Sequence, residues 1–223
     1  MMRSIVVGVV LGMSVMGIAC GGSNKEPGTA ESTKADLGPM DELKSIPGDL
    51  DLEVKGLTKP IDDTQAIIDK LTSMPKRYGL AAGDVMGMAK GTLSNGKVEV
   101  KLDASVAADA RAELEASLKQ LGEIVVALKA TPDKIAGLTT KLATITAKVP
   151  VLATKISTSA QATMTNPFGG ADGKAKAKAD LDGLEKVKLD VNKSVAETQQ
   201  KLGGIPGMAT AALGKLTAAF TAG

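Results

Sequence analysis

The sequence predicts a mainly α-helical protein, an elongated antiparallel helical bundle with coiled-coil-like heptads and a small β element at one end. Three observations support this fold class. The 223 residues include only three aromatic side chains, so the hydrophobic share of 43% comes mainly from Ala, Leu, Val, Ile and Met, which favour helices with a thin core. Apolar side chains recur at helical spacing over much of the chain after residue 103. One stretch also repeats every seven residues, as coiled-coil helices do.

The first residues have the pattern of an export signal. Arg3 supplies a positive charge, and residues 5–18 are uncharged and largely apolar. That run is short for a membrane span and has the length of the apolar region of a secretory signal peptide. It ends in the letters GIAC, whose last residue, Cys20, is the only cysteine of the chain. We therefore predict a signal peptide over residues 1–19.

The GIAC tetrapeptide resembles the lipobox of bacterial lipoprotein precursors, with Gly17 where that motif usually has Leu. The resemblance implies that the Cys20 sulfur receives diacylglycerol, that the chain is cleaved before Cys20 and that the new amine is acylated. It also implies sorting to the bacterial outer membrane, because Gly21 is not the Asp that serves as an inner-membrane retention signal. We expect a lipid-anchored protein on the periplasmic side or at the cell surface. The alternative is an ordinary signal peptide with an incidental cysteine.

The segment behind Cys20 predicts a tether. Residues 21–40 are rich in Gly, Ser, Thr, Pro, Lys and Glu, with one large aliphatic residue, Leu37, before Met40. Such a segment buries too little apolar area to offset the entropy lost on ordering. We predict the lipidated Cys and a disordered tether over residues 20–40, followed by one helical bundle domain over residues 41–223.

Two short segments alternate charged and apolar residues, which is the period of a half-buried strand. They are Asp49–Val54 and Lys97–Leu102, the second preceded by the turn signal Asn95-Gly96. We predict a small β-hairpin or strand pair near residues 49–57 and 92–102. Its carboxylate row is the one candidate for a calcium site, but a solvated strand face explains it better, so no metal site is predicted: Asp49, Asp51 and Glu53.

Two helices are predicted in the first half of the domain. Pro60 and Asp62-Asp63 mark the start of a helix of about four turns, which Pro75 ends or kinks. A longer helix is predicted from Ala104 to about Ala130, with Asp103 as its N-cap. Its apolar stripe is spaced at helical intervals: Leu114, Leu118, Leu121, Val125 and Leu128.

A seven-residue repeat follows Thr131-Pro132, which restarts the helix. It reads KIAGLTT, KLATITA, KVPVLAT and KISTSAQ from Lys134, with Pro150 inside it. Apolar residues at positions a and d with Lys at g predict coiled-coil-type packing, with a kink at Pro150. The seam can be buried within one chain or between copies, so a homo-oligomer stays open. The a residues are Ile135, Leu142, Val149 and Ile156, the d residues Leu138, Ile145 and Leu152, and the g residues Lys134, Lys141, Lys148 and Lys155.

The last part of the chain predicts two more helices. One runs from about Asp172 to Leu202 and ends at Gly203-Gly204, and the other starts at Ile205-Pro206. The preceding turn, NPFGG at residues 166–170, should make its flanking helices antiparallel neighbours.

Composition excludes several kinds of chemistry. The chain has no His and one Cys, so it has no Ser-His-Asp or Cys-His catalysis, no His metal ligand and no CxxC redox motif. Its formal net charge of +2 and the scarcity of aromatic side chains argue against nucleic acid as a partner. No phosphate-binding or dinucleotide-binding glycine motif occurs. We predict no catalytic residue and no cofactor, and hence a protein that is not an enzyme.

Three lysines alternate with Ala at the start of a predicted helix, where cations oppose the helix dipole: Lys174, Lys176 and Lys178. They indicate a basic patch for anionic headgroups or cell-wall polymers, the alternative being a simply solvated helix end.

The sequence thus favours a lipid-anchored cell-envelope protein with a non-catalytic structural or interaction role, whose partners are the membrane, through its anchor, and an envelope protein or the cell wall. Lipobox and heptads together resemble, loosely, the murein lipoproteins of Gram-negative outer membranes. The chain ends in Gly223, without the C-terminal Lys by which that family joins peptidoglycan, so covalent attachment is not implied. Two alternatives stay open: a membrane-active, remodelling or pore-forming protein, suggested by the Ala/Gly-rich stretches 79–89 and 203–222, and a carrier of a hydrophobic ligand.

Overall fold

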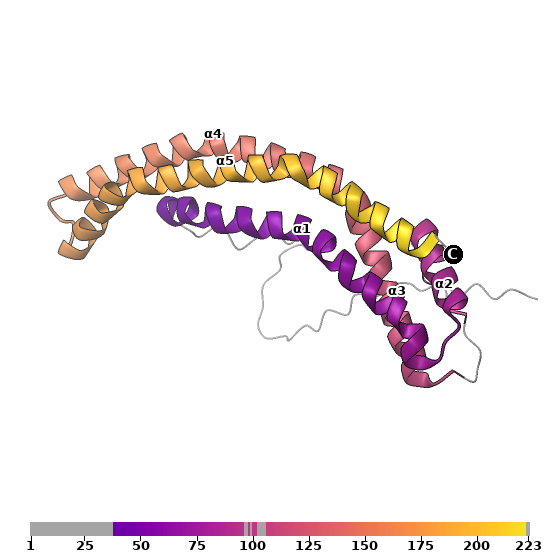
Figure 1. Ribbon diagram of the computed structural model, residues 1–223. Coiled ribbons are helices and arrows are strands. Elements are labelled where there is room, and N and C mark those ends of the chain that lie inside the picture. Colours follow the sequence, from indigo (N-terminus) through magenta and orange to yellow (C-terminus); the bar gives the residue numbers. More distant parts are fainter. Residues whose placement is uncertain (1–37, 96–97, 99, 102–105, 222–223) are drawn as a thin grey trace, which may run out of the picture. The chain divides into compact units, whose positions relative to one another are not determined.

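The computed structural model describes residues 38–95, 98, 100–101 and 106–221, and these are helical almost throughout (Figure 1). The prediction of a mainly α-helical protein is therefore confirmed. Residues from Asp36 onward form one compact unit. The predicted signal peptide and nearly all of the predicted tether lie outside the described residues, whereas Pro39 and Met40 already belong to the first helix. The five helices are α1 (Pro39–Tyr78), α2 (Ala82–Asn95), α3 (Ala108–Lys129), α4 (Thr131–Thr165) and α5 (Ala171–Thr221).

The predicted strand at residues 49–57 is wrong, because this segment lies in the middle of α1. Six alternating residues fit a strand locally, but the wider window follows the helical period, and packing selects it. Leu52, apolar in the alternating pattern, is 68% exposed, while side chains three and four residues apart are buried: Leu43, Ile46, Leu50, Val54 and Leu57. On a helix Asp51 points away from Asp49 and Glu53, and it pairs with Lys55 at 2.6 Å.

The second half of the predicted β element is not formed where the structure describes it. Residues 92–95 end α2, and residues 98, 100 and 101 have no regular secondary structure. The rest of the segment 96–102 lies outside the described residues, as does the predicted N-cap Asp103.

Helices α1 and α5 continue through positions where breaks were predicted. Pro47, Pro60 and Pro75 lie inside α1, which ends at Gly79, the one described residue with a positive φ. The predicted break at residues 203–206 is also wrong, since α5 passes through Pro206. Each internal proline removes a backbone hydrogen bond and favours a bend in its helix, and α1 and α5 are curved in Figure 1. The apolar face continues on both sides of these prolines, so burial of that face outweighs the local cost.

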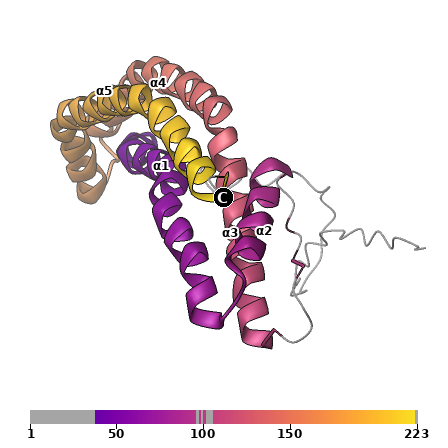
Figure 2. The same ribbon diagram turned by 45° about the vertical axis from the view of Figure 1, so that its right-hand side comes forward.

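The buried side chains form two cores. The three-helix core joins the N-terminal part of α1, most of α4 and the N-terminal two thirds of α5. The four-helix core joins the C-terminal parts of α1 and α5 to α2 and α3, and Figure 2 shows α1, α2 and α3 side by side at this end. Helix α4 runs antiparallel to α1 and α5, but α1 and α5 run in the same direction (Figure 1). The α2–α3 pair returns the chain toward the middle of the unit, and this return allows α4 to run back so that α5 can lie parallel to α1.

The heptad residues of α4 are buried within this chain. All seven a and d side chains lie in the three-helix core or pack against it, and Ile135 alone among them is half-buried. The four g lysines are exposed, and the Nζ atom of Lys141 pairs with the Glu53 carboxylate of α1. The predicted α3 stripe from Leu114 to Leu128 is buried too, in the four-helix core.

Prolines mark the junction of the two cores. The three-helix core ends at Leu57 in α1 and at Ile205 in α5, and Ile61 packs against both cores. Pro60 and Pro206 therefore lie where α1 and α5 exchange α4 for α2 and α3 as packing partners.

Truncating the three-helix core should destabilise the protein strongly. Leu142 is fully buried, so Leu142→Ala is expected to lower the free energy of unfolding by about 2 to 5 kcal/mol in urea denaturation. The matched control is Leu189→Ala, since Leu189 is 68% exposed on α5 and its truncation should change that free energy by less than about 0.5 kcal/mol. Equal effects of the two substitutions would contradict the assignment of the core.

Candidate functional site

The predicted basic patch lies at the start of α5. Lys176 and Lys178 are exposed, and Lys174 is half-buried. The Lys174 stem passes beside Gly169, where its Cε atom would lie 3.4 Å from a Cβ added to that glycine. Lys174 and Lys178 are four residues apart and share one side of the helix, while Lys176 points to the opposite side. The predicted lipidation site, Cys20, lies outside the described residues.

The turn between α4 and α5 carries an exposed aromatic ring. Phe168, one of two Phe residues, is 93% exposed, and Met164 on the last turn of α4 is 41% exposed. The Phe168 N–H donates to Oδ1 of Asn166 at 2.9 Å, and the Gly169 N–H donates to the Asn166 carbonyl at 3.1 Å. A Cβ at Gly169 would lie 3.1 Å from the Thr163 carbonyl, so the tight turn favours glycine there. We name residues 164–178 the α4–α5 tip.

The start of α1 lies at the same end of the unit as the α4–α5 tip (Figure 1). A surface cavity of about 320 Å³ is lined there by the first residues of α1, the last turns of α4 and the first turns of α5. Its polar lining includes Asp41, Ser159, Lys176 and Asp180. The chain segment that leads back to Cys20 thus joins the helical unit beside the tip.

A polar clamp joins the end of α1 to α3. The two terminal guanidinium nitrogens of Arg77 bond the two carboxylate oxygens of Glu113 at 3.0 and 3.1 Å. The Tyr78 hydroxyl also donates a hydrogen bond to Glu113, and the Arg77 guanidinium lies 5.0 Å from the Tyr78 ring centre. Sequence reasoning missed this cluster, because its members are 35 and 36 residues apart and no local pattern connects them.

The clamp shifts the titration of its members. The hydrogen bond from Tyr78 and the charge of Arg77 hold the pKa of Glu113 below its ordinary value, and the same contacts raise the pKa of Tyr78 and of Arg77. The Arg77 side chain is 49% exposed, so water screens the ion pair. The three side chains use their hydrogen-bonding groups on one another and hold α1 and α3 together, so we interpret the clamp as a structural feature.

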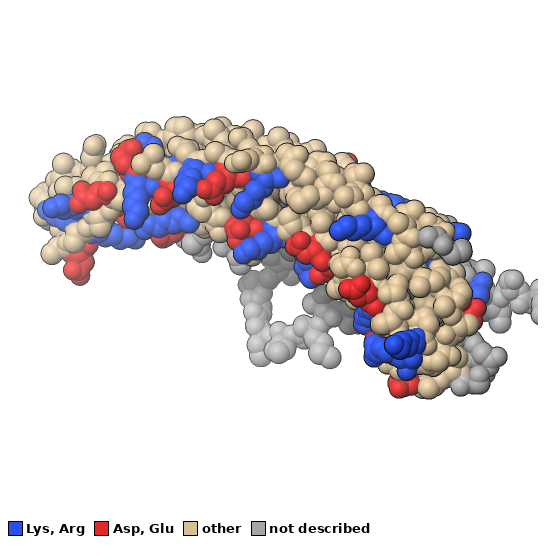
Figure 3. Space-filling view, in the orientation of Figure 1, with Lys and Arg blue, Asp and Glu red and all other residues tan. Residues whose placement is uncertain are grey.

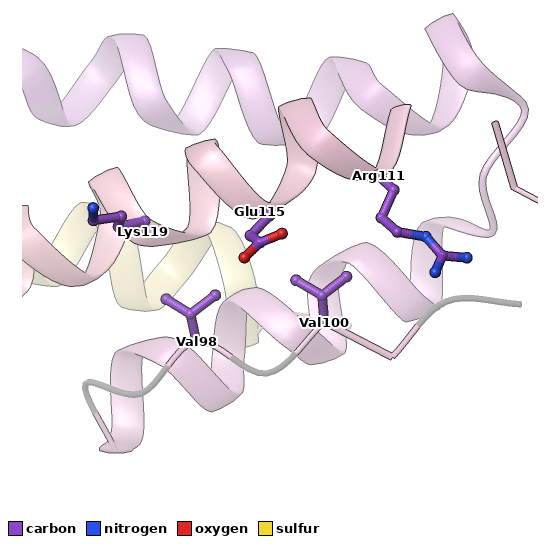
Figure 4. Close-up of a pocket in the computed structure, with 5 residues that line it drawn as sticks. All are labelled: Val98, Val100, Arg111, Glu115 and Lys119. Atoms are coloured by element: carbon purple, nitrogen blue, oxygen red, sulfur yellow. The ribbon is translucent and has the colours of Figure 1, made fainter. Parts of the chain in front are cut away.

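Two other surface cavities lie on the described part of the chain. One, of about 360 Å³, is lined by Val98 and Val100 from the segment after α2 and by three charged side chains of α3, Arg111, Glu115 and Lys119 (Figure 4). The other, of about 280 Å³, lies between α1 and α4 and is lined in part by Gly56 and Gly137. These volumes are at the lower end of the range for ligand pockets, about 300 to 1,000 Å³. Among the residues that the structure describes, no three His, Cys, Asp or Glu side chains gather as a metal site would require.

One described helix, α4, is long and apolar enough to cross a membrane by length and composition. Its heptad face is already buried in the three-helix core. The upper margin of the unit in Figure 3, over α4, is largely free of charged side chains.

A scan against protein-family models and searches of curated proteins and of solved structures give no match to this chain.

Replacing the clamp carboxylate should weaken the protein most at neutral pH. Because the folded-state pKa of Glu113 lies below its ordinary value of 4.5, the ionised group stabilises the fold above that pH. This contribution is lost as the pH falls through the lowered folded-state pKa. The loss of unfolding free energy caused by Glu113→Gln should therefore be largest near pH 7 and shrink in acid. Urea denaturation near pH 7 and in acid tests this expectation, with Glu123→Gln on the same helix as the control. A pH-independent loss would contradict it.

Proposed function

We propose that this chain is a lipid-anchored protein of the bacterial cell envelope with a non-catalytic structural or interaction role. The observation that carries the proposal is the sequence of its first twenty residues, an apolar run that ends in GIAC at the only cysteine. Cys20 would carry the lipid, with the protein on the outer membrane at its periplasmic side or at the cell surface. The helical unit behind it is the part that would be presented to an envelope protein or to the cell wall.

The residues available for chemistry support a structural role. The one cluster of strongly interacting polar groups, among the described residues, is the clamp of Arg77, Tyr78 and Glu113, and its groups are used to hold α1 against α3. The chain has no His to act as a general base near neutral pH. The coiled-coil-type seam of α4 is proposed as part of this scaffold.

The proposed anchor limits where the helical unit can lie. Gly38 lies 18 residues after Cys20. A fully extended chain spans about 3.5 Å per residue, so the first helix starts within about 60 Å of the lipidated residue. The start of α1, and with it the α4–α5 tip, would therefore lie within reach of the membrane that holds the lipid.

Removing the cysteine should abolish lipidation and, with it, localisation to the outer membrane. Cys20→Ala leaves no sulfur for diacylglycerol, so the protein is expected to keep the mass of the uncleaved, unlipidated precursor and to be lost from the outer-membrane fraction. Membrane fractionation and mass spectrometry of cells that express each form measure this. A matched control, Ser23→Ala, changes a neighbouring small residue and should leave both results as in the parent. Unchanged fractionation and precursor size for Cys20→Ala would contradict the proposal.

A membrane-active function is the second candidate, because α4 alone among the described helices has the length and composition of a membrane span. Insertion of α4 would expose the apolar faces of α1 and α5 that it now covers. We therefore expect the full chain to release no dye from phospholipid vesicles. Release that grows with protein concentration, and that Leu142→Ala enhances by loosening α4, would favour the membrane-active candidate.

A further inference from the structure

Positive charge is concentrated in one part of the chain. Between Lys134 and Lys178 the sequence has seven lysines and a single acid, Asp172, whereas the whole chain has 27 basic and 25 acidic residues. The last third of this segment is the α4–α5 tip, which carries three of the lysines. The tip thus has a local excess of lysine, with Asp180 and Asp182 following it on α5 and Asp41 and Glu42 at the nearby start of α1. A local excess of lysine favours an anionic partner.

The α4–α5 tip also carries an exposed apolar side chain. Phe168 is 93% exposed at the point where the chain reverses, and Met164, four residues earlier at the end of α4, is 41% exposed. The hydrogen bonds of Asn166 to Phe168 and Gly169 fix the turn that holds the ring in water. The Lys174 stem passes beside Gly169 and brings one ammonium group near this turn. An exposed apolar ring with lysines near it suits the interface of a bilayer, where the ring enters the headgroup region and the ammonium groups contact phosphates.

Position adds a third, independent observation. The cavity that brings together the starts of α1 and α5 and the end of α4 places the tip beside Gly38. The chain therefore reaches the helical unit at the end that carries Phe168 and the three lysines. A surface that binds the chain through residues before Gly38 is therefore connected to this end of the helical unit.

We propose that the α4–α5 tip docks on the surface of an anionic lipid bilayer. Phe168 enters the headgroup region, and Lys174 and Lys178, which share one side of α5, contact lipid phosphates. Lys176 lies on the other side and shares its cavity with Asp41 and Asp180, so it contributes less. The proposal deepens the proposed function by giving the anchored unit a second contact with its membrane, and it rests on that function only for the identity of the membrane.

The absence of Trp from the sequence allows a direct test on the full chain. Phe168→Trp places the only indole at the tip, and the matched control Leu189→Trp places it at an exposed site on the middle of α5. Both variants are mixed with vesicles of phosphatidylcholine containing phosphatidylglycerol, with brominated acyl chains as quencher. We expect the emission of the Phe168→Trp chain to shift to shorter wavelength and to be quenched, and that of the Leu189→Trp chain to change in neither respect.

The charge dependence is tested in the Phe168→Trp chain. With about 1 kcal/mol per lysine near an anionic surface, Lys174→Gln with Lys178→Gln should lower the ratio of docked to undocked tips about thirtyfold, read from the quenched fraction. The control, Lys201→Gln with Lys215→Gln, removes equal charge from later turns of α5 and should leave the ratio unchanged. Circular dichroism at each step confirms that the helices are retained.

Two outcomes would overturn the inference. One is equal quenching of the Phe168→Trp and Leu189→Trp chains on anionic vesicles. If the indole at the tip then responds to isolated envelopes but not to vesicles, the partner of the tip is a protein or the cell wall. The other is equal docking on vesicles of phosphatidylcholine alone. Running the experiment on chains with Cys20 and with Cys20→Ala distinguishes failure of tip docking from failure of the proposed lipid anchor. Loss of lipidation alone leaves the response of the tip indole in place, and failure of docking leaves fractionation through Cys20 unaffected.

Discussion

The apolar seam that α1 and α5 share is the constraint on which the rest of this structure depends. Each helix is long, 40 and 51 residues, and each contributes side chains to both cores. Helices α2, α3 and α4 complete one core or the other, but only α1 and α5 run through both. Unwinding either long helix at the junction would therefore remove side chains from two clusters at once. This coupling explains why both helices continue through prolines that would end a helix without such a continuous buried face.

The prolines at the junction also bend the shared seam. Pro60 and Pro206 lie between the last residues of the three-helix core and the first residues of the four-helix core. Bending there turns the apolar faces of α1 and α5 from α4 toward α2 and α3, while the helical path is kept. The side chains that pack around this junction are aliphatic: Leu57, Ile61, Ile205 and Ala209.

Sequence patterns predicted those parts of the fold that depend on long helical periodicity. The α3 stripe and the α4 heptads extend over several turns, and their side chains are buried as expected. The strand near residues 49–57 and the break near residue 205 were predicted wrongly because each rested on a short local signal. Alternation over six residues fits a helix as well as a strand, and a Gly-Gly pair with a proline ends a helix only when no tertiary face continues beyond it.

Sequence patterns likewise predicted one part of the candidate site and missed the rest. Lys174, Lys176 and Lys178 were visible as an alternating run, whereas the exposure of Phe168 depends on how the turn stands out from three packed helices. The clamp of Arg77, Tyr78 and Glu113 joins residues far apart in sequence, and no pattern could reveal it. A tip that lies beside the start of α1 follows from the parallel course of α1 and α5, which reflects the shared seam.

Native-state hydrogen exchange tests the central role of this seam most directly. Amides of α1 on the two sides of Pro60, for example at Leu50 and Leu71, lie in different cores. Because both long helices join the cores, the account predicts that these amides exchange through one global opening, with the same free energy and the same urea dependence. The contradictory result is separate exchange, in which the three-helix core opens with a distinctly lower free energy while the amides around Leu71 stay protected.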